Sequence, residues 1–164
     1  MRLSKNFTLD ELTRSNTALR LGIDNTPSKE HILKLRLLTT QFLQVLRDRI
    51  GALRVTSGYR SPKLCEAIGS NKYSQHAKAE AVDLQYFKRG KMDNLKIYNG
   101  IIDGALDFDQ MILEFGTSTE EIDGNPAWIH ISWKVTDNRR EILVAYKDEN
   151  NKTKYRHPKN YHSI

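Results

Sequence analysis

The spacing of hydrophobic residues along the chain changes at Gly51, from a helical repeat to strand-like alternation. Before this glycine, apolar residues recur every three or four positions over residues 32–50, which predicts a helix with one buried face. Thr26 is expected to cap this helix and Pro27 to occupy its first position. The main core helix is therefore predicted to end at Gly51.

Thr8 and Glu11 form a capping-box pattern that predicts a short helix within residues 6–14. After Gly51, shorter apolar runs separated by polar turns predict alternating strands and short helices. Strands are predicted at residues 53–56, 80–85, 110–114, 127–133 and 140–146, and helices at 62–68 and 92–102.

Because helices come mainly first and consecutive strands last, the expected fold class is α+β, with a small, mainly antiparallel sheet and helices packed on one side. A turn through Asp137 and Asn138 is expected to join the last two strands. Residues 1–146 are predicted to form a single domain. Residues 147–164 are polar and are expected to form a tail that is surface-bound or mobile.

The composition narrows the function classes. The 164 residues, 38% hydrophobic and 28% charged, suit one domain with its own core, and we expect a monomer. The formal net charge of +6 suits a polyanionic neighbour. The basic residues are spread along the chain without interleaved aromatics, so no nucleic-acid partner is expected. With no apolar run of roughly 20 residues and no leader-like start, we expect no membrane insertion and synthesis in the cytoplasm without a signal peptide.

Two of the five histidines lie in a pattern typical of a metal site. His76 precedes Asp83 by seven residues, and His130 lies on a predicted strand. Two histidines and one carboxylate suit catalytic zinc, which keeps its fourth position open. Seven extended residues would span roughly 23 Å, so the chain between His76 and Asp83 must fold back if both bind one ion.

The alternation of the strand around His130 gives the direction of its side chain. Trp128 and Ser132 share a face with His130, whereas Ile129 and Ile131 face the opposite side. His130 is therefore expected to point away from the apolar side, toward a cleft.

Three motifs and the opening segment together resemble the M15 peptidases. The resemblance is to the small branch close to the C-terminal domain of the D-Ala-D-Ala carboxypeptidases, and to its phage endolysin relatives. It extends from about Phe7 to Tyr146. Its motifs are FTLDELTRSNTALRLGIDNTP (residues 7–27), SGYRSP (57–62), SQHAKAEAVD (74–83) and WIHIS (128–132).

This resemblance implies the hedgehog/DD-peptidase fold, with Zn²⁺ bound by His76, Asp83 and His130. It also places Arg60 near the metal, where its planar fork suits a substrate carboxylate or carbonyl. The alternative role for Arg60 is to tie down the turn at Gly58.

The substrate-binding residues are expected to be Arg60, Ser74, Trp128 and Ser132. Ser74 either positions its loop or donates a hydrogen bond to substrate. The same two roles are open to its neighbour Gln75, for which ordinary loop polarity is the favoured interpretation.

The chain departs from the family pattern at two positions. Many members place the general base three residues before the last histidine, but this position is Ala127. Glu114 is the best remaining candidate, with Glu121 and Asp123 in reserve. Ala79 stands where the pattern has glycine, and a positive φ there would add strain of about 1 kcal/mol.

The expected function is zinc-dependent hydrolysis of an amide bond in the peptide part of bacterial peptidoglycan. The enzyme would be an endopeptidase or a D,D-carboxypeptidase, and a phage-type endolysin that reaches the wall after phage-mediated membrane permeabilisation. The alternative is a non-catalytic, zinc-containing wall-binding or virion-associated module.

Overall fold

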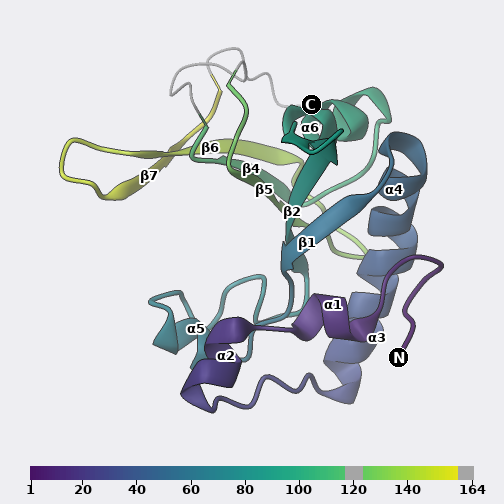
Figure 1. The fold of residues 1–164 in the computed structure, drawn as a ribbon, viewed down its shortest axis with the longest axis vertical. Coiled ribbons are helices and arrows are strands. Elements are labelled where there is room, and N and C mark those ends of the chain that lie inside the picture. The colour runs from purple at the N-terminus through teal and green to yellow at the C-terminus, as the bar shows by residue number, and fades with distance from the viewer. Residues whose placement is uncertain (117–123, 159–164) are drawn as a thin grey trace.

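A seven-stranded mixed sheet lies at the centre of the computed structural model, which describes residues 1–116 and 124–158 (Figure 1). The strands are β1 (Leu53–Ser57), β2 (Ala81–Lys88), β3 (Lys91–Met92), β4 (Gln110–Glu114), β5 (Trp128–Ser132), β6 (Glu141–Lys147) and β7 (Thr153–Arg156). Their order is β1-β2-β5-β4-β6-β7, and β3 pairs with β2. The predicted α+β class is confirmed.

The sheet is mainly but not purely antiparallel, because β4 and β6 run parallel. β5 and β6, which the segment through Asp137 and Asn138 joins, are not neighbours in the sheet. β4 lies between them, antiparallel to β5 and parallel to β6, so the segment through Asp137 and Asn138 crosses past β4. Alternation along a strand identifies its buried face but not its partners, and this is why the sequence did not reveal the crossover.

The helices are α1 (Leu9–Thr13), α2 (Asn16–Leu21), α3 (Lys29–Leu38), α4 (Gln44–Ile50), α5 (Pro62–Ala67) and α6 (Leu95–Asp103), with a π-helical segment, η1 (Thr39–Leu43), between α3 and α4. The capping box of Thr8 and Glu11 is present at α1. The predicted core helix is the continuous α3, η1 and α4. None of the helices within residues 1–116 and 124–158 combines the length and apolar composition needed to cross a membrane.

The predicted start of the core helix is two residues too early. Ser28, not Thr26, is the N-cap, since the backbone N–H of His31 donates to its hydroxyl at 3.2 Å. The backbone N–H of Thr26 instead donates to the Asp24 carboxylate at 2.8 Å. That local turn competes with helix formation and holds Pro27 outside the helix.

The two faces of the sheet differ sharply in character. Alternate residues of β2, β5, β4 and β6 are buried and apolar, and they join one core cluster with the helices α3, η1, α4 and α6. This cluster includes Val82, Leu84, Met111, Leu113, Ile129, Ile131, Ile142 and Val144. The opposite face carries the polar residues of the same strands, and we call it the open face.

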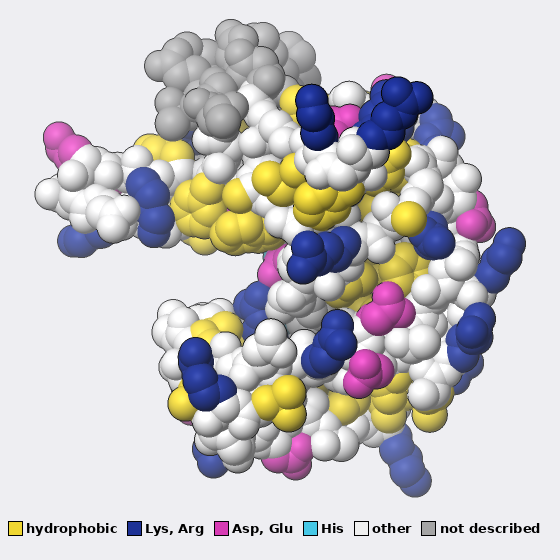
Figure 2. All heavy atoms as spheres, in the orientation of Figure 1, with side chains coloured by type: hydrophobic (Ala, Val, Ile, Leu, Met, Phe, Trp, Pro, Cys, Tyr) yellow, Lys and Arg dark blue, Asp and Glu magenta, His cyan; other side chains and the backbone are white. Residues whose placement is uncertain are grey.

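The sheet continues beyond residue 146, where the predicted domain ends. β6 reaches Lys147, and β7 pairs with it antiparallel, with Ala145 opposite Tyr155. Residues 153–156 therefore belong to the sheet, although their polar composition predicted a tail. The β6–β7 hairpin projects from the body (Figure 1), and the surface is hollowed between it and the part formed by α2 and α5 (Figure 2).

Candidate metal site

His76, Asp83 and His130 converge on the open face. Each is buried and offers one ligand atom, and these atoms all lie within 4.8 Å of one another. Asp83 Oδ1 is 3.3 Å from His76 Nε2 and 3.0 Å from His130 Nδ1. Residues 54 positions apart are thus brought to one point by the fold.

Sheet register explains the approach of Asp83 and His130. The two residues are directly opposite in the antiparallel β2–β5 pair, where side chains of facing residues lie on the same face. Because β2 and β5 are both flanked by other strands, this pair is held rigidly.

His76 comes from the loop before β2, which folds back as the spacing required. The backbone N–H of Ala79 donates to the carbonyl of His76 at 3.2 Å, and that of Glu80 to the carbonyl of Gln75 at 3.0 Å. Ala77 and Ala79 are buried in this turn. Ala79 has φ 59°, so the position where the family pattern has glycine does require the left-handed region.

A hydrogen bond to backbone orients the His76 ring. Its Nδ1 lies 2.7 Å from the carbonyl oxygen of Gly58. A carbonyl only accepts, so Nδ1 carries the proton and Nε2 presents its lone pair beside Asp83. A Cβ at Gly58 would lie 2.3 Å from the backbone oxygen of Leu12, so only glycine lets this carbonyl sit where His76 needs it.

Gln75 orients the His130 ring, and the protonated nitrogen is Nε2 instead of the Nδ1 that is protonated in His76. His130 Nε2 lies 3.0 Å from Gln75 Oε1, and Gln75 Nε2 donates to Asp109 Oδ2 at 3.0 Å. The carboxylate of Asp109 accepts only, so the amide must present its oxygen to His130. His130 therefore carries its proton on Nε2 and presents Nδ1 toward Asp83. Gln75 is a ligand-orienting residue, and its interpretation as loop polarity is wrong.

Asp109 anchors this chain of hydrogen bonds from a buried position. Arg139 contacts both of its oxygens, at 3.0 and 2.8 Å, and Lys134 Nζ lies 3.0 Å from Oδ1. Burial alone would raise the pKa of Asp109, but hydrogen bonds from Arg139 and Lys134 outweigh it and hold the pKa well below its ordinary value. Asp109 thus stays ionised. Nothing in the sequence motifs distinguished it from the other aspartates.

Arg60 reaches the site from the turn after β1. Its Nη2 lies 2.7 Å from Asp83 Oδ2, and its Nε donates to Ser57 Oγ at 2.8 Å. The register of β1 against β2 shifts between Val55 and Ser57, and such a bulge re-aims the chain. Arg60 therefore contacts a predicted metal ligand and also braces the turn.

The charge balance around Asp83 favours its ionised form. Burial by itself would raise the pKa of Asp83. In the protonated, metal-free form of the two imidazoles, the charges of His76 and His130 and their hydrogen bonds outweigh burial and hold the pKa far below its ordinary value. Asp83 is therefore ready to bind a cation.

Glu114 lies on the same open face, at the end of β4. Ile112 is opposite His130 and Glu114 is opposite Trp128 in the β4–β5 register, so Glu114 is displaced from the ligands by two residues. Burial, and to a lesser degree the nearby Asp83, raises its pKa from 4.5 to about 7, against opposing effects of His130 and Arg60. A buried carboxylate with a pKa near neutrality suits a general base.

The other predicted site residues are placed as follows. Ser74 accepts a hydrogen bond from the Ala77 backbone N–H at 3.3 Å, which supports loop positioning. Ser132 has no exposed surface and donates to Asp109 at 3.3 Å, so its predicted contact with substrate is not supported. Trp128 is half-buried beside Glu114 and packs against Phe115, with ring centroids 5.4 Å apart. The reserve bases, Glu121 and Asp123, lie outside the described residues.

The donor set fits a divalent metal ion. Two imidazole nitrogens with assigned lone pairs and one ionised carboxylate oxygen point at one another, and each ligand has a further hydrogen-bond partner that fixes its orientation. Without a cation, three electron-rich atoms this close would repel unless a histidine is protonated. The arrangement is that of a metal site built from a loop and two strands.

The fold is an α+β domain with a buried donor set that could hold a metal ion. The family model for peptidase M15 matches residues 5–99, more than half of the chain, and the protein belongs to this family. A search of curated proteins found no match. The matched segment contains Arg60, His76 and Asp83, and His130 joins them through the sheet. Family and site together indicate a metal-dependent peptidase.

Proposed function

We propose that the protein is a zinc peptidase that hydrolyses an amide bond in the peptide part of bacterial peptidoglycan. The observation that carries the proposal is the pairing of a buried His-Asp-His donor set with a second buried carboxylate, Glu114, on the same face of the sheet. Metal ligation needs the first group, and proton transfer needs the second. Peptidase M15 membership supplies the reaction class.

Each side chain has a role that follows from its surroundings. When bound, zinc acidifies a water molecule and polarises the scissile carbonyl. Glu114 accepts the proton of the attacking water and passes it to the leaving amine nitrogen. Arg60 keeps donors free beside its contact with Asp83 and orients a substrate carbonyl or carboxylate. Trp128 offers a half-buried ring next to Glu114 for the substrate's apolar groups.

Wall peptidoglycan is the substrate that the motif resemblance favours, and the hedgehog/DD-peptidase fold is part of the same proposal. The net charge of +6 suits approach to an anionic wall. We propose that the protein acts as a phage-type endolysin, either an endopeptidase or a D,D-carboxypeptidase.

Purified sacculi provide the first test. Zinc-loaded protein should clear a sacculus suspension, chelator should stop clearing, and added zinc should restore it. Mass analysis of fragments from defined muropeptides would then name the bond, because each new terminus marks a cleavage position. Intact sacculi and muropeptides after incubation with zinc-loaded protein would contradict the proposal.

A non-catalytic, zinc-containing wall-binding module is the second candidate. It is favoured by Ala127, which stands where many relatives carry the base. Sacculi that bind the zinc-loaded protein without releasing any fragment would select this module over the enzyme.

A further inference from the structure

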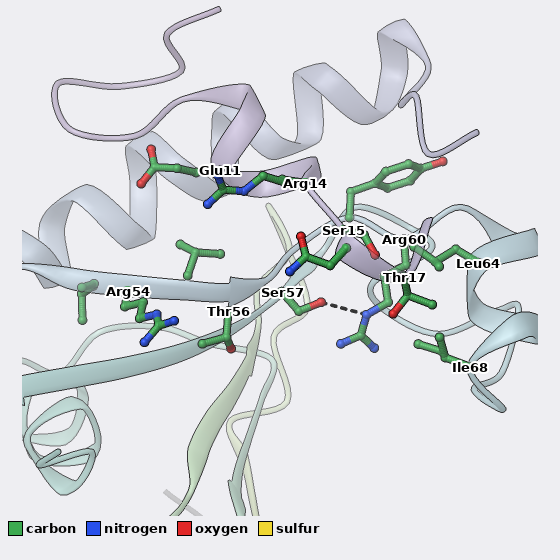
Figure 3. Close-up of a pocket in the computed structure, with 14 residues that line it drawn as sticks. Glu11, Arg14, Ser15, Thr17, Arg54, Thr56, Ser57, Arg60, Leu64 and Ile68 are labelled. Carbon is green, nitrogen blue, oxygen red and sulfur yellow. Dashed lines mark hydrogen bonds between the residues drawn. The ribbon is translucent and has the colours of Figure 1, made fainter. Parts of the chain in front are cut away.

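A polar cleft runs along the outer edge of β1 to Ser57 and Arg60, two residues that adjoin Asp83 of the candidate metal site. We call it the β1 cleft. It has a volume of about 650 Å³ and is lined by residues 11, 14–17, 53–57, 59, 60, 64 and 68. Figure 3 shows β1 along one side, the α1–α2 segment above it, and Arg60 with Ser57 toward α5. Since Ser57 pairs with Asp83 and Arg60 contacts it, the cleft leads to the metal ligands.

The wall of this cleft is an unpaired strand edge. β1 is the last strand on its side of the sheet, with β2 as its one neighbour. Within the described part of the chain, no backbone group of residues 53–57 has a hydrogen bond on the side away from β2. An extended peptide can satisfy such an edge by adding as a further strand.

The cleft is also positively charged. Its lining includes Arg14, Arg54 and Arg60 against a single acidic residue, Glu11. Glu11 is engaged with Thr8 in the capping box of α1, and Arg60 is paired with Asp83. Among the described residues Arg14 and Arg54 have no carboxylate partner, and the Arg54 guanidinium lies 6.0 Å from the centre of the Phe87 ring. Both guanidinium groups are exposed to the cleft, where a carboxylate would find charge-assisted donors.

We propose that the β1 cleft binds an extended, acidic peptide, which adds as a strand to the free edge of β1 and places its carboxylates against Arg14 and Arg54. A peptide lying on β1 is delivered toward Ser57 and Arg60, and so toward the metal. This inference rests on the proposed peptidase function, for which it specifies the part of the substrate away from the bond that is cut.

Binding by metal-free protein tests the cleft independently of hydrolysis. The probes are a fluorescent stem-type pentapeptide ending in D-Ala-D-Ala with a glutamate at its second position, and the same peptide with glutamine there. In chelator, fluorescence anisotropy should show the glutamate peptide binding about tenfold more tightly, as expected for one charge-assisted contact. The preference should weaken with added salt.

Matched variants locate the contact. Arg14→Ala with Arg54→Ala should abolish the preference for glutamate, whereas Arg20→Ala with Arg89→Ala, which removes equal charge outside the cleft, should retain it. A glutamate peptide methylated at alternate backbone nitrogens should bind at least about tenfold more weakly, because it cannot pair with β1.

Equal affinity for the two peptides, no binding of either, or a preference that survives in the Arg14/Arg54 variant would overturn the inference. So would full binding of the methylated peptide. If the preference is present and located in the cleft but no peptide is cut after zinc is added, the proposed hydrolysis fails and the binding site stands. Cleavage without any preference gives the reverse result.

Discussion

Two buried carboxylates on the open face, those of Asp83 and Glu114, are in opposite electrostatic states. Arg60 contacts Asp83, and His76 and His130 outweigh its burial and hold its pKa far below the ordinary value. Glu114 is similarly buried, yet its pKa rises to about 7. The two residues have the same chemistry, and they differ in direct contacts: Arg60, His76 and His130 lie within 3.3 Å of Asp83, whereas His130 and Arg60 act on Glu114 through their charge alone.

This difference assigns the roles. A carboxylate that stays ionised suits metal ligation, and one that titrates near neutrality suits proton transfer. The sheet produces both states on the two strands that flank β5, because the β2–β5 register places His130 opposite Asp83 and the β4–β5 register places Trp128 opposite Glu114.

Asp83→Asn should abolish metal binding and have the largest effect. It removes the anionic member of the donor set, so we expect loss of stoichiometric metal and at least about a 10³-fold loss of hydrolysis, since the chemistry that a bound metal would supply is lost with it. Metal analysis after dialysis measures the first and muropeptide release the second. Asp103→Asn, an exposed change, is the control. Full metal content in Asp83→Asn would refute Asp83 as a ligand.

Glu114→Gln should remove the general base while leaving metal binding intact. Loss of a general base lowers rates by about 10²–10⁴-fold, so we expect that loss in kcat with unchanged metal content. The contrast with Asp83→Asn, which loses both, is the sharpest separation of the two roles. Wild-type activity in Glu114→Gln would move the base elsewhere, and Glu121 and Asp123 would be the next variants.

Sequence reasoning brought the three candidate ligands together because each lies in a short motif of the M15 resemblance. The short polar loop with small residues around His76, and the alternation that separates His130 from Ile129 and Ile131, are both properties of consecutive residues. The same local rules identified the buried face of each strand and the capping box at Thr8.

What sequence reasoning missed depends on contacts between distant segments. Gln75 and Asp109 are 34 positions apart, and their roles follow only from the hydrogen bonds between them and His130. The β4–β6 pairing and the extension of the sheet by β7 are likewise set by which edge is left open. Ser28 is the helix N-cap because the backbone N–H of Thr26 is hydrogen-bonded to Asp24 in a local turn.

The raised pKa of Glu114 predicts how stability depends on pH in metal-free protein. Between pH 4.5 and about 7 the folded state holds a proton on Glu114 that the unfolded state has released. The free energy of unfolding should therefore fall as pH rises through this window, by up to about 3 kcal/mol. Asp83, with its lowered pKa, stays ionised throughout.

Urea unfolding in chelator at several pH values measures this effect. Glu114→Gln lacks the titrating group, so its stability relative to the wild type should increase from pH 4.5 to 7. If the difference in stability between Glu114→Gln and the wild type does not change with pH, the pKa of Glu114 is ordinary. The contrast between Glu114 and Asp83 would then disappear.

Gln75→Ala should weaken metal binding indirectly, through His130. It leaves His130 Nε2 and Asp109 without their shared partner, and loss of such an orienting residue typically lowers metal affinity by about 10–100-fold. Competition with a chromophoric zinc chelator measures the affinity. Gln110→Ala, which removes an amide bound to Glu141 instead, is the matched control. Equal zinc affinity in Gln75→Ala and the wild type would show that His130 needs no such support.

Ala79→Gly should have the smallest effect, and it tests the loop that brings His76 to Asp83. At φ 59° an alanine is strained by about 1–2 kcal/mol, which glycine relieves. Glycine also raises the entropy of the unfolded chain, by about 0.5–1 kcal/mol, and removes a fully buried methyl group. The terms oppose one another, so we expect metal-free Ala79→Gly to be more stable by less than about 1 kcal/mol in urea unfolding. Clear destabilisation would mean that packing of the methyl group outweighs the strain, and that alanine stabilises the turn holding His76.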